Sequence, residues 1–108
     1  MSNEPVCCDL NVFDNDQLRE HKRHAEGINR GLEEIREVDG GYGFRLNPDP
    51  ETIHHAGAFI SGEKQCCPFF NFRLEVPAKN GPVWLYLTGS DGAKRYLYEQ
   101  VVKQGRFD

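Results

Sequence analysis

The chain of 108 residues is 38% hydrophobic and includes seven Phe, four Tyr and one Trp, which is enough apolar material for one core. A second domain has no room, so residues 1–108 are expected to form a single domain whose first five residues are disordered. The formal net charge is -4 and Lys and Arg are spread along the chain, so nucleic-acid binding through a basic stripe is not expected.

Membrane insertion and export are not expected either. The apolar runs are a few residues long, whereas a helix that spans a bilayer needs about 20 apolar residues. Residues 1–5 lack the charged and then apolar pattern of a signal peptide. We therefore expect a cytoplasmic protein.

Residues 6–12 alternate between apolar and polar side chains, which is the period of a half-buried strand. In such a strand Cys8 points to the apolar side and Cys7 points away from it. The sequence therefore predicts a first strand in which Cys8 faces the core.

A first helix is expected from about Asn15, because Asp14–Gln17 has the pattern of a capping box. The pattern does not fix where this helix ends. His21 falls on the line of apolar positions, which recur at steps of three and four residues at Leu18, Ala25, Ile28, Leu32 and Ile35.

A short hairpin and a second helix are expected next. Strands over 36–38 and 42–46 flank the turn at Asp39–Gly41. The helix runs from Glu51 to about Cys66, because the residue before a proline is pushed out of the helical region and Pro68 follows.

The C-terminal third predicts a second hairpin and a last helix. Residues 70–76 and 83–88 alternate clearly, and the helix opens at Ser90 or Asp91 and ends near Gly105. The complete order is β-α-β-β-α-β-β-α. Short hairpin links imply antiparallel pairing, so we expect a two-layer α+β fold with a mostly antiparallel sheet and the helices on one face.

The four cysteines form two adjacent pairs, Cys7-Cys8 and Cys66-Cys67. A reducing compartment favours free thiols or metal ligands. Adjacent cysteines are poor mutual disulfide partners, because a disulfide needs converging Cβ vectors several ångströms apart. Any bridge would join the two pairs across the fold.

The helical periodicity of residues 51–66 predicts where the side chains of Cys66 and Cys67 point. One stripe of this helix is expected to be buried: Ile53, Ala56, Gly57 and Ile60. A step of seven residues from Ile60 reaches Cys67. A neighbouring stripe contains His55, Phe59 and Cys66, with Glu63 beside it. Cys67 is therefore expected to face the core, and Cys66 to lie at its margin.

Three sulfurs, those of Cys8, Cys66 and Cys67, can converge at this helix end. Such a set suits thiophilic ions such as Zn²⁺, Cu(I) or Hg²⁺, and trivalent arsenic also favours three sulfurs. His55 is added as a fourth candidate metal ligand, because eleven helical residues bring it nearly into line with Cys66. The alternative is that Cys8 and Cys67 are small buried hydrophobic residues.

The other histidines rank below the cysteines as candidate ligands. His21 and His24 are spaced to share a helix face, but His21 is expected to be partly buried and His24 solvated. His54 and His55 are adjacent, so they cannot both face one site from a helix. For His55, a surface position is favoured over metal ligation.

Residues 63–72 read Glu-Lys-Gln-Cys-Cys-Pro-Phe-Phe-Asn-Phe. This run resembles the E-[RK]-x-C-C-P-F-[LF]-x-F signature of a small uncharacterised bacterial family, and upstream Cys8-Asp9-Leu10 and Gly41–Phe44 are similar to its C-x-L and G-Y-x-F steps. The resemblance implies an association with heavy-metal response. It makes Cys8, Cys66 and Cys67 the matching positions, and Cys7 a departure.

The leading hypothesis is a small cytosolic protein that binds a metal or metalloid ion, such as zinc, through its cysteines. A cysteine-dependent redox protein or enzyme is the first alternative, with Cys66 as the reactive sulfur, although the negative end of a helix raises a thiol pKa. The second alternative is an interaction module. Trp84 and Tyr86 are out of phase with the core residues of their strand, so their face needs another cover. This cover is either a homodimer partner, or the last helix or N-terminal segment of the same chain.

Overall fold

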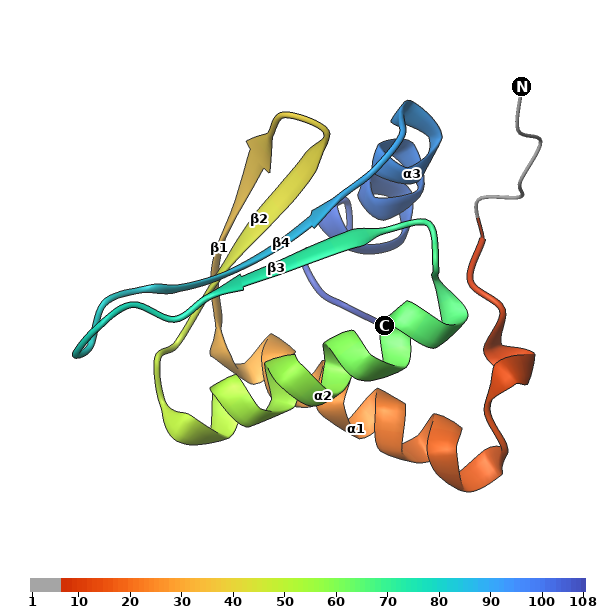
Figure 1. Ribbon diagram of the computed structural model, residues 1–108, viewed down its shortest axis with the longest axis horizontal. Coiled ribbons are helices and arrows are strands. Elements are labelled where there is room, and N and C mark those ends of the chain that lie inside the picture. The colour runs from red at the N-terminus through yellow and green to blue at the C-terminus, as the bar shows by residue number, and fades with distance from the viewer. Residues whose placement is uncertain (1–6) are drawn as a thin grey trace.

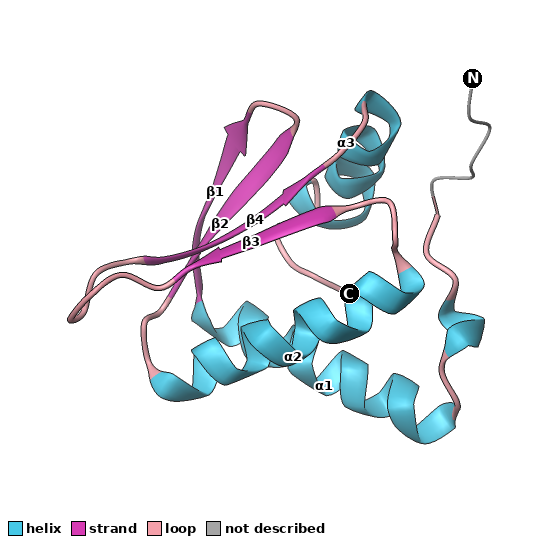
Figure 2. Cartoon of the chain, in the orientation of Figure 1, coloured by secondary structure: helices cyan, strands magenta, loops and turns pink. Residues whose placement is uncertain are grey.

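The computed structural model describes residues 7–108, so the expected disorder of residues 1–5 lies outside the described residues. The fold is α+β, with one antiparallel four-stranded sheet in the order β1-β2-β4-β3 (Figure 1). The helices lie on one face of the sheet, as predicted (Figure 2). The elements are α1 (Asn15–Gly31), β1 (Leu32–Val38), β2 (Gly41–Leu46), α2 (Pro50–Cys66), β3 (Asn71–Glu75), β4 (Val83–Thr88) and α3 (Asp91–Leu97).

The helices begin where their capping residues predict. Asp14 and Gln17 form a reciprocal capping box at the start of α1. Asp49 accepts a hydrogen bond from the backbone N–H of Thr52 at the start of α2, and Ser90 caps α3 in the same way. Among residues 7–108, no helix combines the length and the apolar composition that a bilayer crossing requires.

The predicted first strand is wrong. Within residues 7–12 the structure has no strand, and Leu10–Val12 forms a short 3₁₀ turn, η1. The Asp9 side chain accepts a hydrogen bond from the Asn11 backbone N–H and so stabilises the turn. Leu10 and Val12 are 47% and 44% exposed, so the alternation does not mark a buried face.

Two further predictions, which concern the first and second helices, are wrong in part. α1 ends at Gly31, so Leu32 and Ile35 belong to β1 and not to the helix. The predicted buried stripe of α2 is wrong except for Ala56: Ile53 and Ile60 are half-buried and Gly57 is exposed. The buried residues of α2 are Thr52, His55, Ala56, Phe59, Gly62 and Cys66.

The C-terminal residues complete the core, which the sequence pattern did not indicate. After α3 the chain makes a π-helical turn, η2 (Tyr98–Val102), and Gly105 adopts a positive φ of 75°. The Phe107 ring then packs between Phe44 and Phe59. The Asn29 side chain exchanges two hydrogen bonds of 2.8 Å with the Phe107 backbone, so α1 holds this end of the chain in place.

The outer face of the sheet carries Trp84 and Tyr86, whose rings stack with their centroids 5.8 Å apart. The Arg36 guanidinium lies over the Trp84 ring and the Arg73 guanidinium lies over the Tyr86 ring. These contacts leave Trp84 only 9% exposed. Neighbouring side chains of the same chain therefore cover much of the aromatic pair, and the homodimer stays a prediction.

Candidate functional site

The C-terminal end of α2 brings the cysteine pairs together. Cys66 is the last residue of the helix, and Cys67 caps it by donating its backbone N–H to the carbonyl of Glu63. The N-terminal segment passes beside this end, because the Asp9 backbone N–H donates to the Cys66 carbonyl at 2.9 Å. The Cys8 backbone N–H donates to the Tyr96 hydroxyl of α3 at 3.1 Å. The segment is thus anchored to two helices.

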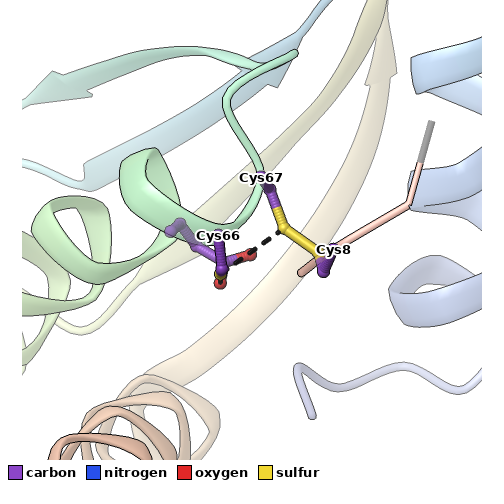
Figure 3. A group of neighbouring side chains, drawn as sticks. Cys8, Cys66 and Cys67 are labelled. Carbon is purple, nitrogen blue, oxygen red and sulfur yellow. Dashed lines mark hydrogen bonds between the residues drawn. A yellow bond between two sulfur atoms is a disulfide. The ribbon is translucent and has the colours of Figure 1, made fainter. Parts of the chain in front are cut away.

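Cys8 and Cys67 form a disulfide across 59 residues, with their Cα atoms 4.7 Å apart (Figure 3). This agrees with the prediction that any bridge joins the two pairs. Cys7 is exposed and free, and Cys66 is buried and free. The Cys66 sulfur lies 3.7 Å from the Cys67 sulfur, so three sulfur atoms meet at one point, as the sequence predicted.

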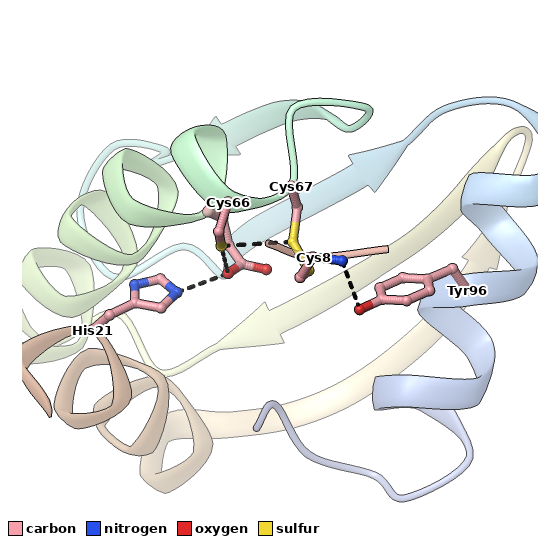
Figure 4. Close-up of a disulfide and its surroundings, with 6 residues drawn as sticks. Cys8, His21, Cys66, Cys67 and Tyr96 are labelled. Atoms are coloured by element: carbon pink, nitrogen blue, oxygen red, sulfur yellow. Dashed lines mark hydrogen bonds and ion pairs between the residues drawn. A yellow bond between two sulfur atoms is a disulfide. The ribbon is translucent and has the colours of Figure 1, made fainter. Parts of the chain in front are cut away.

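A carboxylate completes the group. The Cys66 thiol donates to Glu63 Oε2 at 3.4 Å, and the same oxygen lies 2.7 Å from Nε2 of His21 (Figure 4). One potential ligand atom from each of Cys8, Glu63, Cys66 and Cys67 lies within 4.8 Å of the other three. Glu63 and His21 come from neighbouring helices, so the cluster also joins α1 to α2.

The environment keeps Cys66 protonated. Burial, followed by the charge of the nearby Glu63 carboxylate and its hydrogen bond to the thiol, raises the pKa of Cys66 to about 12. A thiol with such a pKa is a poor nucleophile near neutral pH. It can still become a ligand, because a bound cation displaces the proton.

The oxidation state decides which ligands the cluster offers. In the disulfide form, Cys8 and Cys67 are bonded to each other and cannot act as thiolate ligands. Reduction gives three thiols and one carboxylate at the same place. A group of sulfur and oxygen donors of this kind can hold a metal ion.

His55 is not part of this cluster, which corrects its prediction as a metal ligand. Its Nδ1 lies 3.0 Å from Nδ1 of His24 at the contact between α1 and α2. His55 and Cys66 lie on one helix face but are not close together, because eleven residues advance a helix by about 16 Å. The expectations that His55 is a surface residue and that His24 is solvated are also wrong, since both are buried.

Close helix packing explains this burial. A Cβ atom on Gly27 of α1 would lie 2.2 Å from the His55 ring, and one on Gly62 of α2 would lie 2.3 Å from the His21 ring. Each glycine thus makes room for an imidazole of the other helix. Burial and the Arg23 charge lower the pKa of His24, which favours its neutral form.

Sequence reasoning placed Glu63 near Cys66 but missed the roles of His21 and Tyr96. Both contacts join residues that are far apart in the chain, 42 positions for His21 and Glu63 and 88 for Cys8 and Tyr96. The only sequence signal was that His21 lies on the apolar line of its helix. Comparisons of this chain with protein-family models, with curated proteins and with solved structures give no match.

Proposed function

We propose that the reduced protein binds one thiophilic metal or metalloid ion through Cys8, Cys66 and Cys67, with Glu63 as a fourth donor or an outer partner. The observation that carries the proposal is the convergence of four donor atoms within 4.8 Å. Three of them are sulfurs, which select zinc, Cu(I) and other soft or borderline ions over magnesium or calcium.

The spacing of the cluster supports a tetrahedral ion such as zinc. Two sulfur ligands at 2.3 Å from a tetrahedral centre lie about 3.8 Å apart. The sulfurs of Cys66 and Cys67 are 3.7 Å apart, and the Cys66 sulfur is 3.4 Å from Glu63 Oε2. These pairs need little rearrangement, whereas Cys8 and Cys67 must first separate from bonding distance.

The binding reaction therefore begins with a reductant, which a cellular dithiol supplies. The dithiol transfers two electrons and two protons to the disulfide, so it becomes a disulfide while Cys8 and Cys67 become thiols. The ion then replaces the thiol protons, which pass to solvent. A reducing cytoplasm, the compartment expected from the sequence, keeps the cluster in this form.

His21 contacts the Glu63 carboxylate and is not itself one of the four donors. It lies 2.7 Å from the Glu63 oxygen that also accepts from Cys66, so it fixes the orientation of that carboxylate. Such an outer partner positions a ligand and tunes its affinity. Both side chains are largely shielded from water, which strengthens the interaction.

The redox alternative receives less support. A reactive cysteine needs a lowered pKa, whereas the pKa of Cys66 is raised to about 12. The resemblance to the heavy-metal-associated family, the absence of nucleic-acid binding and the homodimer through Trp84 and Tyr86 stay predictions.

Ion titration followed by native mass spectrometry tests the proposal. The reduced protein is expected to bind one Zn²⁺ ion per chain, and the oxidised protein, with the same sequence, is expected to bind none at this site. The triple variant Cys8→Ser, Cys66→Ser, Cys67→Ser should lose the ion, while Cys7→Ser is the matched control and should keep it. Equal stoichiometry in the triple variant would show the proposal to be wrong.

A further inference from the structure

A cavity of about 180 Å³ lies next to the sulfur cluster. It is lined by residues of the N-terminal segment, the three helices, β4 and the C-terminal end of the chain. Its walls are mainly apolar, and the side chains that form them include Phe59, Phe70, Leu87, Leu97, Val101 and Phe107.

The cavity and the candidate metal site share a wall. Cys8 and Glu63 line the cavity and also belong to the group of four donors. His21, which holds Glu63, lines the cavity as well. An atom bound to the Cys8 sulfur can therefore carry a substituent into the apolar space.

The volume defines the size of that substituent. An apolar cavity of 150 Å³ in another protein stays dry and admits benzene. A space of about 180 Å³ is thus large enough for one six-membered carbon ring. A bare metal ion does not use this space, whereas an ion with an organic group bonded to it does.

We infer that the preferred cargo of the site is an organic derivative of a trivalent metalloid, namely a monoaryl arsenic(III) compound whose arsenic is held by Cys8 and Cys67 and whose ring occupies the cavity. This inference rests on the proposed function. The disulfide supports the choice of the two sulfurs, because it shows that these two side chains reach each other. Cys66 then remains a thiol, hydrogen-bonded to Glu63.

The chemistry balances without a change of oxidation state at arsenic. An arylarsonous acid, Ar–As(OH)₂, reacts with two thiols of the reduced protein. Two As–S bonds form, two As–O bonds break and two water molecules leave. Inorganic arsenite has no aryl group and three exchangeable oxygens, so it takes all three sulfurs, including Cys66.

The N-terminal segment forms the part of the cavity wall that contains the Cys8 sulfur. Cys8 and Leu10 line the cavity, and the disulfide ties this wall to α2. After reduction, two backbone hydrogen bonds still hold the segment, from Cys8 to Tyr96 and from Asp9 to Cys66. The same step that frees the sulfurs thus loosens the wall.

Competition binding to the reduced protein tests the inference. The probes are phenylarsonous acid, methylarsonous acid and arsenite, each competed with a small dithiol to correct for intrinsic thiol affinity. Wild type is expected to prefer the phenyl over the methyl compound by about tenfold or more, because the cavity buries the ring. Equal corrected affinities for the phenyl and methyl compounds would overturn the inference. Arsenite binding in that case would still support the proposed function, because arsenite needs the sulfurs but not the cavity.

Two pairs of variants sharpen the test. Val101→Phe fills the cavity and should abolish the phenyl preference, whereas Val102→Phe, at a half-buried neighbour that does not line the cavity, should keep it. Cys66→Ser should weaken arsenite and spare the phenyl compound, and Cys8→Ser should weaken both. A phenyl preference that survives Val101→Phe in a folded protein would place the ring elsewhere. The wild-type comparison stands even if that variant does not fold.

Discussion

Reducing the Cys8–Cys67 disulfide should lower the free energy of unfolding of the ion-free protein, and the size of the loss depends on the length of the loop that the bridge closes. The bridge joins residues separated by 59 positions. The chain-entropy relation for a loop of this length gives about 4 kcal/mol, because the crosslink restricts the unfolded chain. The free energy of unfolding should fall by that amount on reduction, and the dependence on urea should steepen because the unfolded chain expands.

An ion that binds the reduced protein should restore the lost stability. Binding to the folded state alone contributes about 4 kcal/mol when the free ion exceeds its Kd by a thousandfold. Urea unfolding is therefore measured on the oxidised protein, on the reduced protein, and on the reduced protein with Zn²⁺. Cys8→Ser is the control, because it lacks the bridge and its stability should not respond to the reductant.

Two results would refute this reasoning. A loss below about 1 kcal/mol on reduction would mean that other contacts hold the N-terminal segment in place and that the loop-entropy argument does not apply. A loss of the expected size with no recovery on adding Zn²⁺ would mean that the reduced sulfurs do not form an ion site.

Three other predictions concern the thiol and the α1–α2 contact. In a Cys7→Ser background, the alkylation rate of Cys66, measured by mass spectrometry, should rise with pH well beyond pH 9 without levelling. The reason is that burial and the Glu63 carboxylate together raise the pKa of this thiol to about 12, so a plateau below pH 9 would contradict this cause. Because burial lowers the pKa of His24 in the folded state, the free energy of unfolding should decrease as pH falls below about 6.5, and His24→Gln should flatten this decrease in denaturant titrations. Gly27→Ala should destabilise the fold by about 1–3 kcal/mol, because the added Cβ meets the His55 imidazole. Gly57→Ala, where the added Cβ meets open space, should be neutral or stabilising in thermal melts.

Local signals explain what the sequence predicted correctly. The caps at Asp14, Asp49 and Ser90 act within three residues, so the starts of the helices follow from the sequence. Pro68 likewise fixes the end of α2. The helix end therefore placed Cys66 and Cys67 correctly, whereas Cys8 reaches them from a segment that does not form the expected strand.

Long-range packing explains the errors. Residues 6–12 alternate like a strand in the sequence. In the structure Asp9 forms a local turn and a disulfide ties Cys8 to the end of α2, so residues 7–12 do not join the sheet. The buried face of α2 is rotated because Gly27 and Gly62 allow close approach of α1. Periodicity within one helix cannot show that His55 is buried against a glycine of another helix, far from Cys66.

X-ray absorption at the edge of the bound ion identifies the atoms that hold it. For the reduced protein with one Zn²⁺ per chain, we expect a first shell dominated by sulfur at about 2.3 Å, with three sulfurs and one oxygen or nitrogen. Each single serine substitution at Cys8, Cys66 or Cys67 should remove one sulfur from that shell. A shell of oxygen and nitrogen alone, or a sulfur count that these substitutions leave unchanged, would show that these cysteines do not hold the ion.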